Sequence, residues 1–283
     1  MKNKEVIGQW SESAPYWEKY RPVIVEMFAP VAQALIEDAG IAPGNSVLDV
    51  ATGPGEPALT IAEVVGPEGT VVGTDVAREM IEAARRAADR CKIHNAKFAE
   101  TFSDSLPFAG NTFDAVVSRF GVMFFPSPVD CLREMLRVLR PGGRIALAVW
   151  HWQDKNPFDY AVNRVVDRYM ERYLEPTAPK PGASDMFRFA KPGDLVAVLS
   201  SAGATAISER LLQFSIRAGL SAEEFWTLRS EMSEKMRTKL ALLSEPQRAE
   251  LKRDAIEAIR AYSVNDGISI PAEVLVVSGA KPA

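Results

Sequence analysis

The sequence predicts an α/β fold built on a doubly wound, mostly parallel sheet. Short apolar runs alternate with amphipathic segments from residue 46 to residue 150, and Gly or Pro marks most of the junctions. This alternation is typical of parallel strands that are covered by helices on both faces. With 283 residues, 47% of them hydrophobic, the chain is long enough for one large domain or for a domain with a substantial insertion.

The segment 47–62, VLDVATGPGEPALTIA, reads as a buried strand, a glycine turn and the start of a helix. Gly53 and Gly55 allow the backbone to bend sharply and to approach a ligand closely. Asp49 adds a carboxylate near the end of the strand, and the N–H groups of a helix start favour an anionic group. We therefore expect a nucleotide-like ligand here, although a turn without a ligand also fits the pattern.

Two kinds of ligand fit this turn. Residues 53–58, GPGEPA, match the G-x-G-x-x-A pattern of a dinucleotide site, and Asp75 follows a second apolar run. Against NAD, Glu56 places a negative charge where a pyrophosphate would dock, and Pro57 removes a backbone N–H from the helix start. A ligand with one carboxylate and a positive centre suits the loop better, and S-adenosylmethionine is such a ligand.

The apolar periodicity predicts the elements in chain order. The strands expected in the first half are Ser46–Ala51, Thr70–Thr74, Ala96–Glu100, Phe113–Ser118 and Arg144–Trp150, and the helices are Ala58–Val65, Ala77–Lys92 and Val129–Leu139. A helix over Asn156–Leu174, a Pro-rich loop over 175–182, a short helix over Lys191–Ser201 and a strand over Ala204–Ile216 follow. Two charged helices, Ser221–Leu243 with a capping box and Glu245–Tyr262, precede a last strand over Ile270–Ser278.

These elements suggest four segments. Residues 1–40 form a helical flap, residues 41–152 the ligand-binding core, residues 153–190 a helical insertion with a loop, and residues 191–283 the rest of the sheet. The helical pair at 221–262 is either a lid over the strand ends or a hairpin that packs on the core or forms a homodimer. Aromatic residues of the flap either belong to the core or cover a cationic ligand; they are Trp10, Tyr16, Trp17 and Tyr20.

Charge and composition argue against several classes of partner. The formal net charge is −4 and the pI is near 5.5, which gives no electrostatic footprint for nucleic acid. No apolar run has the length of a signal peptide or of a membrane span. The two cysteines, Cys91 and Cys131, lie far apart and form no C-x-x-C pair, so we expect reduced thiols and no metal site. The expectation is a cytoplasmic protein without nucleic-acid or membrane partners.

Four motifs occur in a fixed order: VLDVATGPGEPAL, VVGTDVAREMIEAA, LPFAGNTFDAVVSRFGVMFF and LREMLRVLRPGGRIALAVW. Together they resemble class I S-adenosylmethionine-dependent methyltransferases, closest to the ubiquinone and menaquinone C-methyltransferase branch (methyltransferase type 11). The resemblance implies a Rossmann-like, seven-stranded sheet whose last strand is antiparallel, with helical cap or lid insertions. It places Ser46–Ala51 in the middle of the sheet and Ile270–Ser278 near the fifth strand.

The resemblance also implies roles for single residues. The methionine end of the cofactor would be lined by Asp49, Ala51, Gly53 and Gly55, and Tyr16 would close over it. Asp75 would accept hydrogen bonds from both ribose hydroxyls, although its carboxylate could instead cap the helix that follows. Arg119 and Phe120, just after the fourth strand, would bracket the ligand.

The adenine end departs from the family pattern. Val76 and Met80 would pack on the adenine ring. Relatives commonly carry an Asp four residues before the Leu-Pro-Phe motif, but here that position is Phe102. Either Ser103 and Asp104 replace its hydrogen bond, or packing alone holds the adenine.

The expected function is the transfer of a methyl group from S-adenosylmethionine to a small-molecule acceptor through an O, N or C atom, with S-adenosylhomocysteine as product. The alternatives are a cofactor-binding regulatory or scaffold protein without turnover, and an RNA methyltransferase, which the acidic charge disfavours. His151 directly follows the fifth strand and is the candidate general base, unless the strand end turns its side chain toward solvent. His94 lies in a connecting turn and is expected at the surface.

Overall fold

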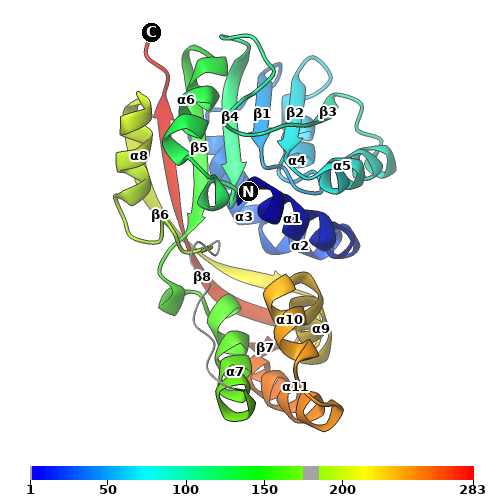
Figure 1. Cartoon of the computed structure of the whole chain (residues 1–283). Helices are drawn as coiled ribbons and strands as arrows, with labels where there is room; N and C mark the ends of the chain where they lie inside the picture. Colours follow the sequence, from blue (N-terminus) through cyan, green and yellow to red (C-terminus); the bar gives the residue numbers. More distant parts are fainter. Residues whose placement is uncertain (1, 175–184) are drawn as a thin grey trace.

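The structure, a computed structural model, describes residues 2–174 and 185–283, so the Pro-rich loop expected at 175–182 lies outside the described residues. The chain begins with three helices, α1 (Lys2–Lys19), α2 (Arg21–Met27) and α3 (Ala29–Asp38). Figure 1 shows α1 and α2 at the lower end of the sheet, where the parallel strands finish. The amino-terminal segment therefore lies at the carboxyl edge of the sheet.

The central sheet has the order β3-β2-β1-β4-β5-β8-β6. Five of its strands are mutually parallel: β1 (Ser46–Val50), β2 (Thr70–Asp75), β3 (Ala96–Glu100), β4 (Phe113–Arg119) and β5 (Leu139–Trp150). The strand β8 (Gly267–Ala280) inserts between β5 and β6 (Thr205–Ala218) and is antiparallel to both. The expected doubly wound sheet with an antiparallel last strand is thus confirmed, with the first strand at its middle.

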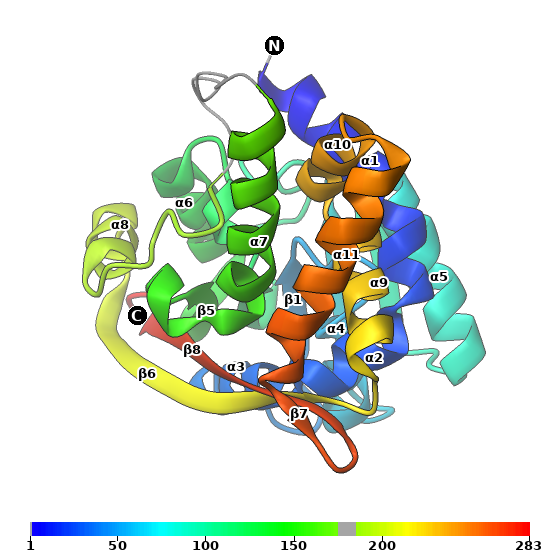
Figure 2. The same cartoon turned by 90° about the horizontal axis from the view of Figure 1, so that it is seen from below.

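Helices cover both faces of this sheet. Figures 1 and 2 show α6 (Pro128–Val138) and α8 (Asp194–Ala202) on one face, and α3 and α4 (Ala58–Val65) on the other. A fifth helix, α5 (Arg78–Cys91), packs on β2 and β3. Val47 and Leu48 of β1 are fully buried, as expected of a strand with helices on both sides. The connection from β3 to β4 contains no helix.

Beyond the parallel strands, the long strands β6 and β8 carry a group of four helices, which we call the lid; the lid role expected of residues 221–262 itself stays a prediction. Its members are α7 (Pro157–Tyr173), α9 (Ala222–Met232), α10 (Glu234–Ala241) and α11 (Glu245–Arg260). Figure 1 shows the lid below the parallel strands, around the lower halves of β6 and β8. The lid therefore lies at the end of the sheet where the parallel strands finish.

Three details differ from the sequence prediction. The helix expected over Ser221–Leu243 is two helices, because Ser233 leaves the helical conformation and its hydroxyl caps α10 by accepting from Met236 N–H. A two-residue strand, β7 (Ser263–Val264), pairs with the start of β8. The strand β5 begins at Leu139, earlier than expected, because Leu139 already pairs with Phe113 before the register shifts. The expected capping box of Ser221 and Glu224 is present.

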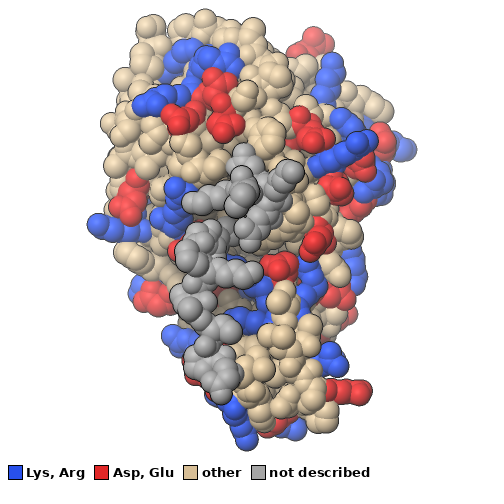
Figure 3. Space-filling view, viewed as in Figure 1, with Lys and Arg blue, Asp and Glu red and all other residues tan. Residues whose placement is uncertain are grey.

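The described residues contain no helix that is long and apolar enough to cross a membrane, and no group of three or more His, Cys, Asp or Glu side chains that could hold a metal ion. On the face shown in Figure 3, the basic and acidic side chains are interspersed. That face has no extended area of one sign.

Candidate functional site

Two neighbouring parallel strands end in strained turns. Ala51 follows β1 and Phe120 follows β4, and both residues have left-handed backbones with φ of 62° and 60°. Such a conformation costs a residue with a Cβ on the order of 1–3 kcal/mol, and strain of this kind clusters at functional sites. Gly121 keeps the turns close, because a Cβ on it would lie 2.5 Å from the Cβ of Ala51. The ends of β1 and β4 are therefore closely packed against each other at the carboxyl edge of the sheet.

The glycine turn leaves open space beside this edge. Gly53 has a φ of +55°, and a Cβ placed on it would have no heavy atom within 4 Å. Gly55 also has a positive φ, but it faces Leu59 and Ala84, so it serves packing. Of the two glycines, only Gly53 presents a bare backbone toward space that a ligand could fill.

Asp75 ties the end of β2 to the glycine turn. Its carboxylate accepts hydrogen bonds from Gly53 N–H and Ala77 N–H, both at 3.0 Å. Burial raises the pKa of Asp75, since its side chain lies in the interior where the charged form is disfavoured. The carboxylate does not cap α5, whose N-cap residue is Ala77 and has no side-chain cap. The structure thus brings together Gly53 and Asp75, two of the residues expected to bind the cofactor.

Three buried polar atoms near the ends of β1 and β4 have no hydrogen bond of ordinary length and angle within the described residues, although the Thr52 hydroxyl faces the Asp49 carboxyl and acts to lower its pKa. They are Asp49 Oδ1, Thr52 Oγ1 and Ser118 Oγ. An unsatisfied buried polar atom costs about 1–3 kcal/mol, so native proteins rarely keep such atoms without a reason. A polar ligand at this edge would supply the missing partners. Thr52 and Ser118 were not among the residues expected from sequence, because a single hydroxyl in an apolar run gives no distinctive signal.

Asp49 has a second role at the start of α4. Its Oδ2 accepts a hydrogen bond from Ala58 N–H at 3.2 Å, so this helix start is already satisfied by a carboxylate. Burial raises the pKa of Asp49 to about 7, because the fully buried carboxyl is poorly solvated when charged. The start of α4 was expected to attract an anionic ligand, but the Asp49 carboxylate already occupies this position.

Glu56 is also neutralised within the protein. Its carboxylate forms an ion pair with Arg21 of α2 and accepts a hydrogen bond from Thr60 Oγ1 at 2.7 Å. The backbone carbonyl of Glu56 accepts from Arg119 Nη2 at 3.3 Å. Burial lowers the pKa of Arg119, whose guanidinium also lies 5.9 Å from the ring centre of Phe28. Arg119 thus stands beside the glycine turn, at the end of β4.

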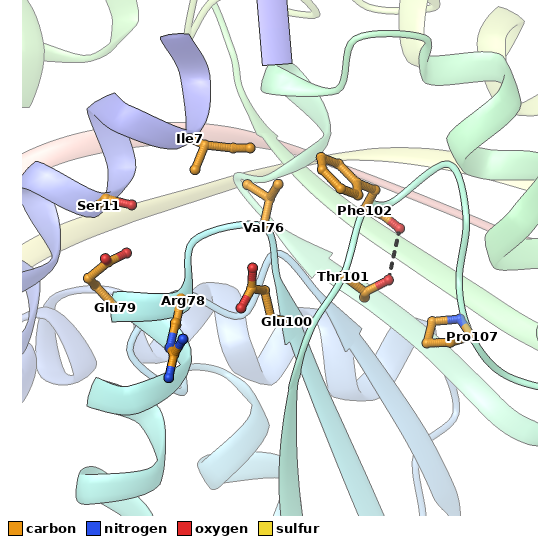
Figure 4. Close-up of a pocket in the computed structure, with 9 residues that line it drawn as sticks. All are labelled: Ile7, Ser11, Val76, Arg78, Glu79, Glu100, Thr101, Phe102 and Pro107. Atoms are coloured by element: carbon orange, nitrogen blue, oxygen red, sulfur yellow. Dashed lines mark hydrogen bonds between the residues drawn. The ribbon is translucent and has the colours of Figure 1, made fainter. Parts of the chain in front are cut away.

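A cavity of about 410 Å³ lies next to this edge, between the ends of β2 and β3 and the helix α1. Figure 4 shows its nine lining residues, with Ile7 and Ser11 of α1 on one side: Ile7, Ser11, Val76, Arg78, Glu79, Glu100, Thr101, Phe102 and Pro107. Val76 and Phe102 of the expected adenine region are among them. Ile7 and Ser11 were missed by the sequence analysis because they come from a distant helix without a motif.

The other residues expected around the adenine lie elsewhere. Met80 is buried with Ala14 and Ala77, against Trp10 and Trp17. Ser103 turns its hydroxyl to the Sγ of Cys131 at 3.2 Å, and Asp104 is exposed. These residues do not line the cavity. Besides Val76 and Phe102, polar side chains line the cavity, among them Ser11, Glu79 and Glu100, so it offers a planar ligand both packing surfaces and hydrogen-bonding groups.

Helix α1 connects the core with the lid. Glu18 pairs with Arg86 and Arg90 of α5, at 2.7 Å and 3.1 Å. Tyr20, just after α1, donates to Glu231 of α9 at 2.7 Å, and Tyr16 lies under the guanidinium of Arg237, 4.5 Å from the ring centre. The amino-terminal aromatic residues therefore divide between two tasks. Trp10 and Trp17 pack on the core, whereas Tyr16 and Tyr20 contact the lid.

A row of stacked rings leads from the end of β4 to the lid, and we call Phe120, Trp150 and Phe158 the aromatic row. The ring of Phe120 stacks on Trp150 with centres 4.6 Å apart, and Trp150 stacks on Phe158 at 6.0 Å. Phe28 packs edge-on against all three rings. The row begins at the strained turn after β4, so it starts beside the glycine turn and finishes on the first turn of α7.

His151 lies on the opposite face of the sheet from the aromatic row. Side chains alternate along a strand, and Trp150, the residue before His151, points into the row. His151 Nδ1 is 2.7 Å from Glu273 Oε2 of β8, and Gln213 of β6 donates to the same carboxylate. The geometry gives His151 a role in joining β5 to β8, and it favours the alternative in which the His151 side chain turns away from the acceptor over the general-base role.

Comparisons with known proteins extend this description. Residues 47–143 match a methyltransferase domain family. The ubiquinone/menaquinone biosynthesis C-methyltransferase UbiE of Ectopseudomonas mendocina is 36% identical over 157 residues, which are 54% of this chain and 59% of the relative. The match thus spans less than two thirds of the curated relative.

Solved structures share the fold. The YcgJ protein of Bacillus subtilis is 20% identical with a TM-score of 0.54, over 89% of this chain and 98% of that chain. A phosphoethanolamine N-methyltransferase 2 of Haemonchus contortus, solved with phosphomonomethylethanolamine and S-adenosylhomocysteine, is 17% identical with a TM-score of 0.54, over 94% of this chain and 58% of that one. At these identities the likeness concerns the fold.

Proposed function

We propose that the chain transfers a methyl group from S-adenosylmethionine to a small-molecule acceptor. The support is that residues 47–143 match a methyltransferase domain family and that a UbiE C-methyltransferase is 36% identical over 157 residues. When bound, S-adenosylmethionine supplies a methyl group that its sulfonium already activates for displacement. The protein then has to hold the acceptor in line with this methyl group, and such alignment can be worth about 7–11 kcal/mol.

The residues at the carboxyl edge fit this cofactor. Asp75, which already holds the glycine turn, would accept hydrogen bonds from the ribose hydroxyls. The methionine end would lie at Gly53, where the backbone is bare, and near Asp49, whose carboxylate would attract an ammonium group. The adenine would enter the cavity between Val76 and Phe102. Tyr16, Ala51, Arg119 and Phe120 would surround the ligand, as the family resemblance implies.

The observation that carries the proposal is a set of three buried polar atoms at the ends of β1 and β4. Within the described residues, Ser118 Oγ has no partner, and Asp49 Oδ1 and Thr52 Oγ1 have at most each other. A protein that never bound a polar ligand there would be more stable without them. Their positions beside a strained turn and an open glycine favour a ligand with several hydrogen-bonding groups. Binding, and not stability, would then be the reason that Thr52 and Ser118 are polar.

The test replaces Thr52 with Val, which removes the hydroxyl and keeps the shape. We expect the free protein to be as stable as the wild type or more stable, while calorimetry shows S-adenosylhomocysteine binding weakened about 5- to 20-fold. Thr74→Val is the matched control, because the Thr74 hydroxyl is buried but donates to the carbonyl of Asp49 at 3.4 Å. It should lower stability and leave the affinity within about twofold.

Turnover is measured separately, as S-adenosylhomocysteine formed from S-adenosylmethionine with a panel of phenols, amines and quinol-like carbon acids. Wild-type protein that neither binds S-adenosylhomocysteine nor forms it with any acceptor would contradict the proposal. Binding of S-adenosylhomocysteine that the Thr52→Val change does not weaken would place the ligand away from the ends of β1 and β4.

A further inference from the structure

Arg229 of α9 is a buried cation whose surroundings the cofactor site does not explain. Its side chain is 12% exposed, and its guanidinium lies 4.3 Å from the ring centre of Phe158. Its Nε forms no hydrogen bond within the described part of the chain. Arginine has five N–H donors and stays charged in proteins, so a buried guanidinium with an unused donor is costly.

The ion pair of Arg229 with Asp159 is too loose to account for this position. Arg229 Nη2 and Asp159 Oδ1 are 3.5 Å apart, whereas well-formed pairs between guanidinium and carboxylate lie near 2.7–2.9 Å. Asp159 also has other partners, because its Oδ1 accepts from Asn163 at 2.8 Å and its Oδ2 from Gln153 at 2.9 Å. The carboxylate is therefore satisfied by neutral amides, and the guanidinium is not.

Arg229 stands at the far end of the aromatic row. The ring beneath its guanidinium is Phe158, the last ring of the row, and Phe120 at the other end is the residue that turns away from β4 beside the cofactor site. Stacked and largely buried rings thus connect the place of methyl transfer with a buried positive charge. Such apolar surroundings suit a molecule with a planar or apolar body and one negative group.

We propose that Arg229 binds a carboxylate of the methyl acceptor, whose apolar body lies along the aromatic row. The proposal rests on the proposed function and names its substrate class. The Nε and Nη2 groups share one edge of the guanidinium, and together they match the two oxygens of a carboxylate. A doubly charged phosphate would meet stronger repulsion from Asp159 on the same side. The carboxylate is bound and is not the group that accepts the methyl.

The test uses full-length protein saturated with S-adenosylhomocysteine and two pairs of probes, benzoate with methyl benzoate and indole-3-acetate with its methyl ester. Calorimetry should show that at least one acid binds about tenfold or more tighter than its neutral ester. In Arg229→Gln the affinity for that acid should fall about tenfold or more, and the affinity for the ester should stay within about twofold. Phenyl phosphate should bind more weakly than benzoate.

Two further variants keep the test decisive. Arg253→Gln removes an arginine of α11 that is 74% exposed, and it should leave the binding of the acids unchanged. Arg229→Lys keeps the charge in case the glutamine variant does not fold, and it should weaken the acid because it loses the planar pair of donors. Affinity for S-adenosylhomocysteine, measured for each variant, reports the cofactor site by itself.

The proposal is overturned if neither acid is preferred to its ester by the wild type, or if both Arg229 variants bind the acid as the wild type does. In either case an unchanged affinity for S-adenosylhomocysteine would leave the proposed methyl transfer standing. If the wild type did not bind S-adenosylhomocysteine at all, the proposed function itself would be contradicted. Tighter binding of phenyl phosphate than of benzoate would replace the carboxylate with a phosphate and overturn the proposal.

Discussion

The cofactor half and the acceptor half of the candidate site are built in different ways. The cofactor half is polar, and its main parts lie close together in sequence, from Asp49 to Asp75. The proposed acceptor half is mostly aromatic and combines the residue after α2, the end of β4, β5, α7 and α9, so that Phe28 and Arg229 are about two hundred residues apart. One half depends on hydrogen bonds that backbone turns provide, and the other on packing between distant elements.

This difference determines how each half responds to substitution. In the cofactor half, a lost hydrogen bond should change the affinity for the ligand, because buried polar atoms there lack well-formed partners among the described residues. In the acceptor half, removing a ring or a charge should change the choice of acceptor. The predictions that follow test this separation, beginning with the largest expected effect.

Asp75→Ala should give the largest change. Hydrogen bonds to a charged acceptor contribute about 1.5–3 kcal/mol each, so losing two of them should weaken S-adenosylhomocysteine binding by at least about 100-fold in calorimetry. Glu82→Ala, which removes a partly exposed carboxylate from α5, is the control. Circular dichroism should show the same fold for both variants. Equal affinity of the Asp75 variant and the wild type would separate Asp75 from the cofactor.

The sequence was sufficient to predict the parts of the cofactor half that lie within one motif. A strand, a glycine turn and a helix follow one another directly, so Gly53 and Asp75 could be expected at one site, whereas the hydrogen bond between them came from the structure. The order of the sheet also followed from the alternating pattern and the family resemblance. Local patterns carry this information because each element there packs mainly on its neighbours in sequence.

The features of the fold and of the candidate site that the sequence did not predict depend on contacts between distant segments. Nothing in the composition of α1 indicated that Ile7 and Ser11 would line the cavity. The break between α9 and α10 depends on one serine cap, which a helical pattern does not reveal. The aromatic row combines residues from the end of β4, from β5 and from α7, so no single stretch of sequence contains it.

Asp49→Asn should change how stability depends on pH. The pKa of Asp49 is raised from 3.8 to about 7 in the folded protein, so between these values the folded state keeps a proton that the unfolded state has lost. Stability from this group is therefore fully present below about pH 4 and is lost as the pH rises through 7, by at most about 4 kcal/mol.

Asparagine does not titrate, so Asp49→Asn does not lose stability in this way. The melting temperature of the variant minus that of the wild type should therefore rise from pH 4 to pH 7 and stay constant above pH 7. Asp104→Asn, which removes an exposed carboxylate, serves as the control. A constant difference in melting temperature between Asp49→Asn and the wild type across this range would show that Asp49 is ionised throughout.

His151→Ala should give the smallest effect. Because its ring pairs with Glu273 on the face away from the aromatic row, we expect turnover to stay within about threefold, with some loss of stability. Glu273→Gln should behave in the same way. A general base would instead show a 10²- to 10⁴-fold loss and a pH–rate profile that loses its limb near neutrality. That outcome would mean that the acceptor binds on the His151 face of β5 and not on the face of the aromatic row.

Hydrogen–deuterium exchange with and without S-adenosylhomocysteine tests the separation of the two halves most directly. Amides of the glycine turn at 51–58, the start of α5 at 75–80 and the cavity wall at 100–102 should exchange more slowly with the ligand, whereas residues 245–260 of the lid should change little. Protection confined to the lid, or no protection at the glycine turn, would contradict a cofactor site at the carboxyl ends of β1 and β2.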